Sequence, residues 1–274
     1  MENKDNPGER FPEELDGSTH QKSSPAHRQR FGPLPVLLLA LLGGVAGFVL
    51  RQVMLHHRMA DPLAGGWPYT CLWIVTAVVL IGLAVLSSGM GSRSAYAENF
   101  KPFWPATVGA WLAASAFFVQ SVLELTGPGA PLQRVVSVLG LFSASALLVQ
   151  GYLRQKGRIS APLGMLVCLF LGIRLVMNFR QWSIDPLVGD FCFELLADVC
   201  VLLACYHTIG FAFSSGRRRT SIFFSMAASF LCCICMADGG FFYPACFVWI
   251  LTGCCSLNYP PRPRRTPGGN GNPS

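Results

Sequence analysis

From residue 33 onward, the chain alternates between long apolar runs and short polar connections. The runs are continuous and have about the 17–25 residues that a helix needs to cross about 30 Å of hydrocarbon. Transmembrane β-strands would instead show shorter segments of alternating apolar and polar residues. The sequence therefore predicts an all-α, polytopic transmembrane helix bundle with eight spans, at residues 33–54, 67–87, 103–125, 131–153, 161–179, 186–213, 221–237 and 241–257.

The last two predicted spans are separated only by Asp238-Gly239-Gly240. Consecutive glycines interrupt helices, because glycine loses more conformational freedom than other residues when it enters a helix. We therefore expect two helices in a tight hairpin. One long kinked segment, which would give seven spans, is the alternative.

Both ends of the chain are polar and rich in charge, Pro, Gly and Ser. Such segments cannot bury enough apolar surface to fold. We expect residues 1–32 and 258–274 to be disordered cytoplasmic tails around a single bundle at 33–257. The first apolar run begins too far from Met1 for an ordinary signal peptide and is interpreted as an uncleaved helix.

The charged residues sit mainly at the ends of apolar runs. They make up 13% of the chain, against about 25% in soluble domains, and the mean hydropathy is +0.44. The net charge of +7 comes from small basic clusters that flank the runs, a pattern that encodes orientation in a bilayer rather than nucleic-acid binding. If the N-terminus is cytoplasmic, sixteen Lys and Arg fall on the inner side and four on the outer side, namely Arg51, Arg58, Arg134 and Arg180. We therefore expect a membrane protein with both termini inside.

All eleven cysteines lie within apolar runs, where a thiol behaves as a small hydrophobic group. Cys232 and Cys235 have the C-x-x-C spacing of thiol oxidoreductases. A reactive thiolate needs an electropositive neighbourhood, and none is evident around this pair. We interpret the cysteines as packing residues.

The fifth and sixth runs contain the candidate site residues Arg174, Glu194 and Asp198, with Asp190 at its entrance. Ionisable groups inside a membrane helix cost at least about 2.5–3.5 kcal/mol each and usually have a partner or a function. At about 1.5 Å per residue, Arg174 and Glu194 lie at similar depths below the outer surface, so we expect them to pair. The i, i+4, i+8 spacing of Asp190, Glu194 and Asp198 places three carboxylates on one helix face.

Two interpretations of this cluster remain open. In the first, the residues line a polar intramembrane cavity that binds a small solute or cation, as in a transport-type subunit. In the second, an Arg174–Glu194 pair locks the hairpin and a protonated Asp198 donates a hydrogen bond, as in a structural or regulatory partner of another membrane protein. A membrane enzyme is a distant third, because Asp198 and Asp238 lack the Gly-x-Gly-Asp context of intramembrane aspartyl proteases. No cofactor or metal site is expected, since the histidines lack ligand spacing.

Two further expectations concern packing. Glu124 and Arg134 are predicted to lie at the same level and to pair. Gly43 with Gly47, and Gly109 with Ala113, have the small-xxx-small spacing that allows close contact between helices, and we expect this contact inside the bundle.

Several short segments resemble uncharacterised multi-helix membrane proteins of anaerobic Gram-positive bacteria. The resemblance covers about the last hundred residues. It is carried by Asn178-Phe179-Arg180-Gln181-Trp182, Glu194-Leu195-Leu196-Ala197-Asp198, Gly210-Phe211-Ala212-Phe213, Gly216-Arg217-Arg218-Arg219, Phe223-Phe224 and Ala237-Asp238-Gly239. It implies a bacterial plasma membrane. That group has no known activity, so the resemblance assigns no functional residue.

Overall fold

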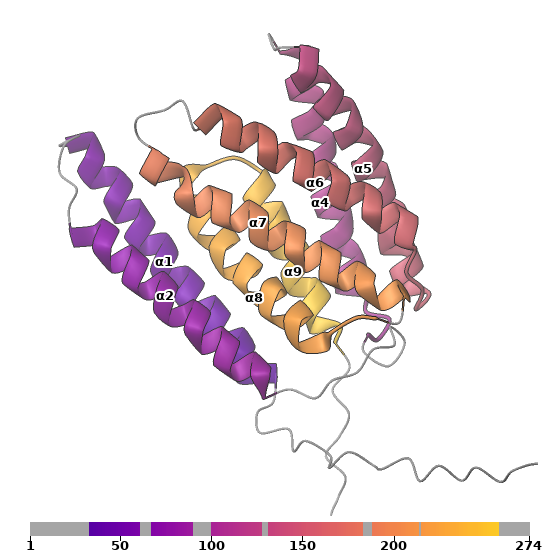
Figure 1. The fold of residues 1–274 in the computed structure, drawn as a ribbon, viewed down its shortest axis with the longest axis horizontal. Helices are drawn as coiled ribbons and strands as arrows, with labels where there is room; N and C mark the ends of the chain where they lie inside the picture. The colour runs from indigo at the N-terminus through magenta and orange to yellow at the C-terminus, as the bar shows by residue number, and fades with distance from the viewer. Residues whose placement is uncertain are drawn as a thin grey trace, which may run out of the picture.

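The computed structural model describes residues 33–60, 67–89, 100–127, 131–182, 188–213 and 215–257, and most of them are helical (Figure 1). The α-helices are α1 (Pro33–Ala60), α2 (Trp67–Ser88), α4 (Trp104–Thr126), α5 (Pro131–Gln155), α6 (Ala161–Trp182), α7 (Val188–Gly210), α8 (Arg218–Cys235) and α9 (Phe242–Cys255). Two short 3₁₀ turns, η1 (Phe211–Phe213) and η2 (Met236–Asp238), extend α7 and α8.

The all-α fold and the eight helices agree with the sequence prediction, but two details differ. α1 continues to Ala60 rather than ending at residue 54, because the first proline after the apolar run is Pro62. Seven of the described helices are long and apolar enough to cross a membrane. α9 has 14 residues and is about 21 Å long, which is shorter than the hydrocarbon core.

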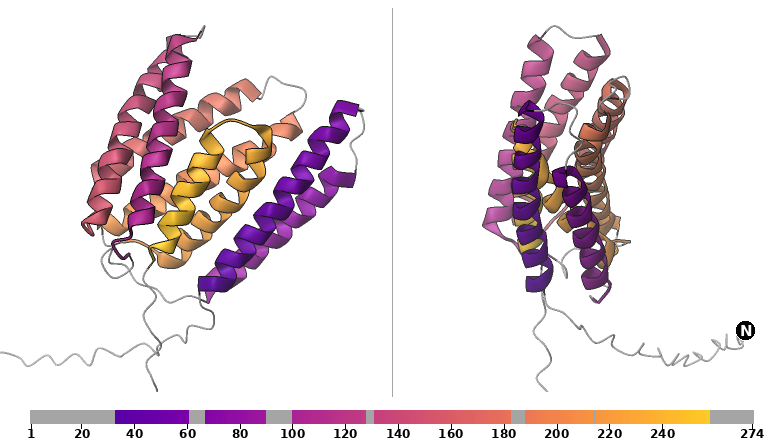
Figure 2. Two further views of the ribbon diagram at one scale, coloured as in Figure 1. Left: turned by 180° about the vertical axis from the view of Figure 1, so that it is seen from behind. Right: turned by 90° about the vertical axis from the view of Figure 1, so that its left-hand side faces the viewer.

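Six helices form a closed ring in which each packs against the next, in the order α4, α5, α6, α7, α8, α9 and back to α4. The α1–α2 hairpin lies outside this ring and packs mainly on α8 (Figures 1 and 2). α8 therefore has neighbours on most sides, and 67% of its most apolar segment is buried, against at most 44% in the other six candidate spans.

The ring closes where α4 meets α9. A Cβ atom at Gly109 would overlap the side chain of Thr252 and lie 3.1 Å from the carbonyl oxygen of Val248, so only glycine allows this approach. Just before α4, the backbone N–H of Lys101 donates to the carbonyl of Ser256, 2.9 Å away. Gly43 and Gly47 make similar close contacts between α1 and its neighbours, so the small-residue contacts lie within the bundle, as predicted.

Aromatic rings fill the interior of the six-helix ring. Phe117 of α4 is fully buried. Its ring centroid lies 5.6 Å from that of Phe170, 5.2 Å from that of Phe242 and 6.4 Å from that of Trp249. Because these residues come from α4, α6 and α9, Phe117 links three sides of the ring.

All eleven cysteines are free in the structure. Cys232 and Cys235 are fully buried within α8. Both belong to the hydrophobic core, which agrees with the packing role predicted for this pair, whereas Cys255 is exposed.

The helices alternate in direction, so the connections lie at two opposite ends of the bundle (Figure 2). We call the end that carries the α5–α6 and α7–α8 connections the basic end. Seven of the described basic residues lie there, namely Lys101, Arg154, Lys156, Arg158, Arg217, Arg218 and Arg219. All four acidic residues with described side chains, Glu124, Glu194, Asp198 and Asp238, lie in the opposite half. We call this half the acidic end.

The turn between α8 and α9 depends on two glycines with positive φ, Gly239 at 86° and Gly240 at 89°. Gly239 also has ψ near 180°, a conformation that is essentially restricted to glycine. The predicted break is therefore confirmed, and the alternative of one long kinked segment is wrong.

Replacing Gly239 by alanine is expected to lower the free energy of unfolding by about 1–3 kcal/mol, because alanine strains this backbone conformation. Gly172→Ala is the matched control. A Cβ atom there meets no other atom within 4 Å, and alanine favours a helix interior by about 1 kcal/mol. Detergent-solubilised protein unfolded with SDS provides the measurement. Equal effects of the two substitutions would contradict the role of Gly239.

Candidate polar site inside the six-helix ring

Arg174 of α6 points into the ring, where its guanidinium carbon lies 3.9 Å from the centroid of the Phe242 ring. Its ion-pair partner is Glu124 of α4, with Nη1 3.8 Å from Oε1. The predicted pair between Arg174 and Glu194 is therefore wrong.

Glu124 has three partners. It accepts hydrogen bonds from Gln120 Nε2 at 2.7 Å and Ser137 Oγ at 3.3 Å, in addition to its ion pair with Arg174. Arg134, the predicted partner, is instead exposed near the start of α5. Glu124 thus connects α4, α5 and α6 rather than forming a pair at the surface.

Asp198 of α7 is buried in the ring, with only 4% of its surface exposed. Its Oδ2 atom accepts a hydrogen bond from Asn178 Nδ2 of α6, 3.1 Å away. Its Oδ1 atom is buried and has no hydrogen-bond partner among the described residues. A buried carboxylate oxygen without a partner costs more than about 1–3 kcal/mol, so a proton, a water molecule or a cation is expected at Oδ1.

An offset between α6 and α7 explains the wrong pairing. Asn178 lies four residues before the end of α6, whereas Asp198 lies ten residues after the start of α7. The two helices are therefore displaced by about six residues, or about 9 Å, from the arrangement in which their ends are level. This displacement moves Arg174 well past Glu194. Asn178 follows Arg174 by one helical turn and is the hydrogen-bond partner of Asp198. No partner for Asp198 was predicted from the sequence.

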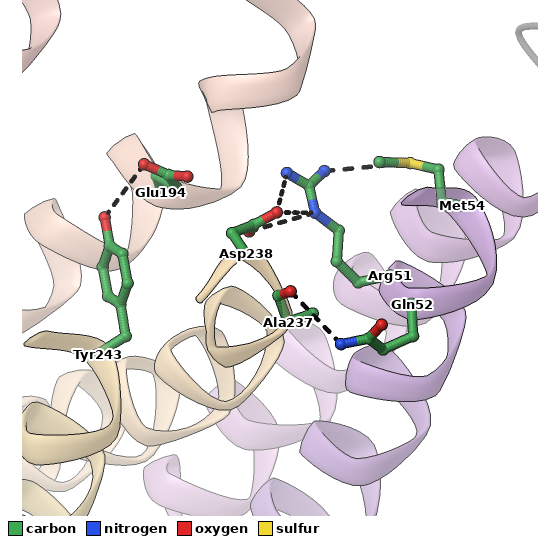
Figure 3. Close-up of polar contacts among 7 residues, drawn as sticks. All are labelled: Arg51, Gln52, Met54, Glu194, Ala237, Asp238 and Tyr243. Atoms are coloured by element: carbon green, nitrogen blue, oxygen red, sulfur yellow. Dashed lines mark hydrogen bonds and ion pairs between the residues drawn. The ribbon is translucent and has the colours of Figure 1, made fainter. Parts of the chain in front are cut away.

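Glu194 is half-buried and faces α9, where the Tyr243 hydroxyl donates to its Oε2 over 3.5 Å. Figure 3 shows this contact beside an ion pair between Arg51 and Asp238. Asp198, Asp238 and Arg51 are all close enough to Glu194 to influence its charge.

The ion pair between Arg51 of α1 and Asp238 of η2 was not predicted. Nη2 of Arg51 lies 2.9 Å from Oδ1 of Asp238, and Nε donates to both carboxylate oxygens at 3.0 and 3.3 Å (Figure 3). The side chains are 3% and 14% exposed. Arg51 lies within α1, inside the predicted span 33–54, but no partner was predicted for it.

The fourth predicted site residue, Asp190, is the third residue of α7. Its side chain lies outside the described residues, so the predicted stack of three carboxylates is described only for Glu194 and Asp198.

Two of the four described carboxylates at the acidic end form ion pairs, and two do not. Asp238 pairs with Arg51, and Glu124 pairs with Arg174. Glu194 and Asp198 have no ion pair within the part of the chain that the structure describes, and they lie one turn apart on α7. Arg174 acts on Asp198 and Arg51 acts on Glu194 only at longer range. Two adjacent carboxylates that lack a direct ion pair attract cations or protons and repel anions.

Among the described residues, no three His, Cys, Asp or Glu side chains are grouped in a way that could hold a metal ion. Comparisons of the chain with family models, with curated proteins and with solved structures give no match.

Proposed function

We propose that the protein is a multi-pass plasma-membrane protein that binds a small cation, or a small solute with a cationic group, at Asp198 and Glu194. In this proposal it acts as a transport-type subunit, and the six-helix ring holds the site away from lipid. The observation that carries the proposal is the buried Oδ1 atom of Asp198, which has no partner in the described structure.

The carboxylates of Asp198 and Glu194 could supply some of the oxygen ligands of a cation. Asn178 fixes the orientation of the Asp198 carboxylate through Oδ2 and leaves Oδ1 available. Glu194, one turn away, is held by a long hydrogen bond from a neutral hydroxyl group. Ionisable groups with these surroundings inside membrane helices commonly mark ion or substrate pathways.

The distribution of basic residues supports an orientation. The seven basic residues of the basic end lie at the end of the bundle where α1 begins and α9 ends. Cytoplasmic segments of membrane proteins carry an excess of Lys and Arg. We therefore place the basic end and both termini in the cytoplasm and the acidic end on the outer side.

Thermal unfolding of the full chain in a non-ionic detergent tests the proposal. The probes are Na⁺, K⁺, Mg²⁺, ammonium and basic amino acids, at constant ionic strength. A bound cation at 100 times its dissociation constant is expected to add about 2.7 kcal/mol to stability. Asp198→Asn should abolish this stabilisation, because the amide keeps the shape of the carboxyl group but not its charge.

Glu98→Gln is the control, since it removes a carboxylate from the segment between α2 and α4. It should leave the response to the cation unchanged. The absence of stabilisation by every probe, or the same stabilisation in Asp198→Asn, would overturn the proposal. Either result would favour the alternative in which a protonated Asp198 serves only packing and the protein is a structural or regulatory partner of another membrane protein.

A further inference from the structure

A cavity lies inside the ring toward the basic end, and its lining includes Arg154, Ser221 and Trp249. It has a volume of about 70 Å³, and part of it opens to the outside. Its walls come from α5, α6, α7, α8 and α9 and are mostly apolar, with Val167, Ile209, Ile222 and Trp249 among them. This volume is several times the ~10–15 Å³ that one water molecule needs.

The polar part of this cavity contains a cation. Arg154 of α5 lines the wall, and its Nη2 atom donates to the carbonyl of Gly253 at 3.0 Å and to Ser256 Oγ at 2.9 Å. Its guanidinium carbon also lies 5.2 Å from the centroid of the Phe100 ring. All these partners are neutral, and no acidic side chain within the described residues lies at this end.

Two buried polar atoms that belong to the cavity lining have no hydrogen-bond partner in the described structure. One is a donor, Arg154 Nε, and the other is an acceptor, Gln150 Oε1. The hydroxyl-bearing residues Thr208, Ser221 and Ser225 also line the cavity. Buried polar groups are nearly always paired, so an unpaired donor and acceptor beside an apolar cavity indicate the place of a polar ligand group.

We propose that this cavity binds an alkyl chain with an oxyanion head, with the head at Arg154 and the chain against the apolar walls. The uncompensated guanidinium selects an anionic head, and a charge-assisted hydrogen bond from Nε to an oxyanion is stronger than one to a neutral group. The apolar walls select the chain. A carboxylate and a phosphate monoester share this chemistry, and the test distinguishes them. The site is independent of the cation site at Asp198.

Quenching of Trp249 fluorescence by a brominated alkyl chain tests the proposal, because Trp249 lines the cavity. The full chain is placed in nanodiscs of zwitterionic lipid and titrated with bromododecanoate. The difference between the wild-type protein and Trp249→Phe isolates the signal of this tryptophan from that of the other five. We expect saturable quenching of the Trp249 component, with displacement by dodecanoate or by dodecyl phosphate. The tighter competitor identifies the head group.

Arg154→Gln is expected to weaken binding about tenfold or more through loss of the charged contact. Arg158→Gln is the matched control, since Arg158 is exposed at the same end and does not line the cavity. Arg154 also holds the end of α9, so a second variant, Ala204→Leu, reduces the cavity volume without touching the polar contacts. It should also weaken binding.

Three results would overturn the proposal. The first is displacement by dodecanol as effective as by dodecanoate, which would remove the role of the oxyanion. The second is displacement by inorganic phosphate alone, which would remove the role of the chain. The third is quenching that is unchanged in a folded Ala204→Leu variant, which would place the brominated chain in the surrounding lipid.

Discussion

Replacing Arg51 by alanine is expected to lower the free energy of unfolding by about 3 kcal/mol. Arg51 is the ion-pair partner of Asp238, and its removal leaves a largely buried carboxylate without a counter-charge. Breaking a buried pair in this way typically costs about 3–5 kcal/mol. We expect the lower end of this range, because the Asp238 side chain is 14% exposed. Unfolding by SDS in detergent micelles measures the change.

Gln52→Ala is the control for this experiment. Gln52 is adjacent to Arg51 and donates only an exposed hydrogen bond, at 3.4 Å, to the carbonyl of Ala237. Its loss should cost well under 1 kcal/mol. The double substitution Arg51→Met with Asp238→Asn should recover much of the loss, since it removes both charges together. A loss in the double variant as large as in Arg51→Ala would show that the arginine acts through packing rather than through the ion pair.

Replacing Phe117 by alanine is expected to be at least as damaging, with a loss of about 3–5 kcal/mol. The phenyl ring is fully buried and contacts aromatic rings from α6 and α9. In a membrane, helices associate largely through packing contacts of this kind. The substitution would leave a cavity between α4, α6 and α9 and remove the contacts of Phe117 with aromatic side chains of α6 and α9.

Phe118→Ala is the matched control, because Phe118 is the next residue on the same helix and is 54% exposed. It removes the same number of atoms from a side chain that faces outward, so its effect should stay within about 0.5 kcal/mol. The same SDS titration serves both variants. Equal losses in the two would show that the interior of the ring does not depend on the aromatic core.

The helices themselves could be predicted from the sequence because their signals are local. Pro33, Pro131 and Pro162 mark helix starts, and Gly239-Gly240 marks the turn before α9. The apolar runs between these signals are long enough to leave little choice of secondary structure. The end of α1 was placed too early, at residue 54 just before His56, His57 and Arg58, although no helix-breaking residue stands there.

The candidate site could be predicted only in part. The cost of burying charge in a membrane correctly indicated that Arg174 and Asp198 face the interior of the bundle, while their role stays a prediction. Their partners could not be predicted, because these depend on how far each helix slides along its neighbour. That displacement depends on contacts between the helices, such as the close approach of Gly164 of α6 to the Ile209 side chain of α7. The sequence of the segment that connects the two helices does not predict these contacts.

Contacts between residues far apart in the sequence were the hardest to predict. Arg51 and Asp238 are separated by 187 positions in the sequence, and their contact exists only because the α1–α2 hairpin packs on α8. The contact between α4 and α9 that closes the six-helix ring likewise joins helices that are far apart in the sequence. Gly109 indicated that a close contact would form, but its partner on α9 could not be inferred from the sequence alone.

The position of Asp198 also has an electrical consequence. It lies ten residues, or about 15 Å, along α7 from the acidic end, which is about half the thickness of the hydrocarbon core. A unit charge that reaches it from that side crosses about half of the membrane potential, worth about 1.1 kcal/mol per 100 mV. If the proposed cation site is filled from that side, a potential of 100 mV would change its affinity for a monovalent cation about sevenfold.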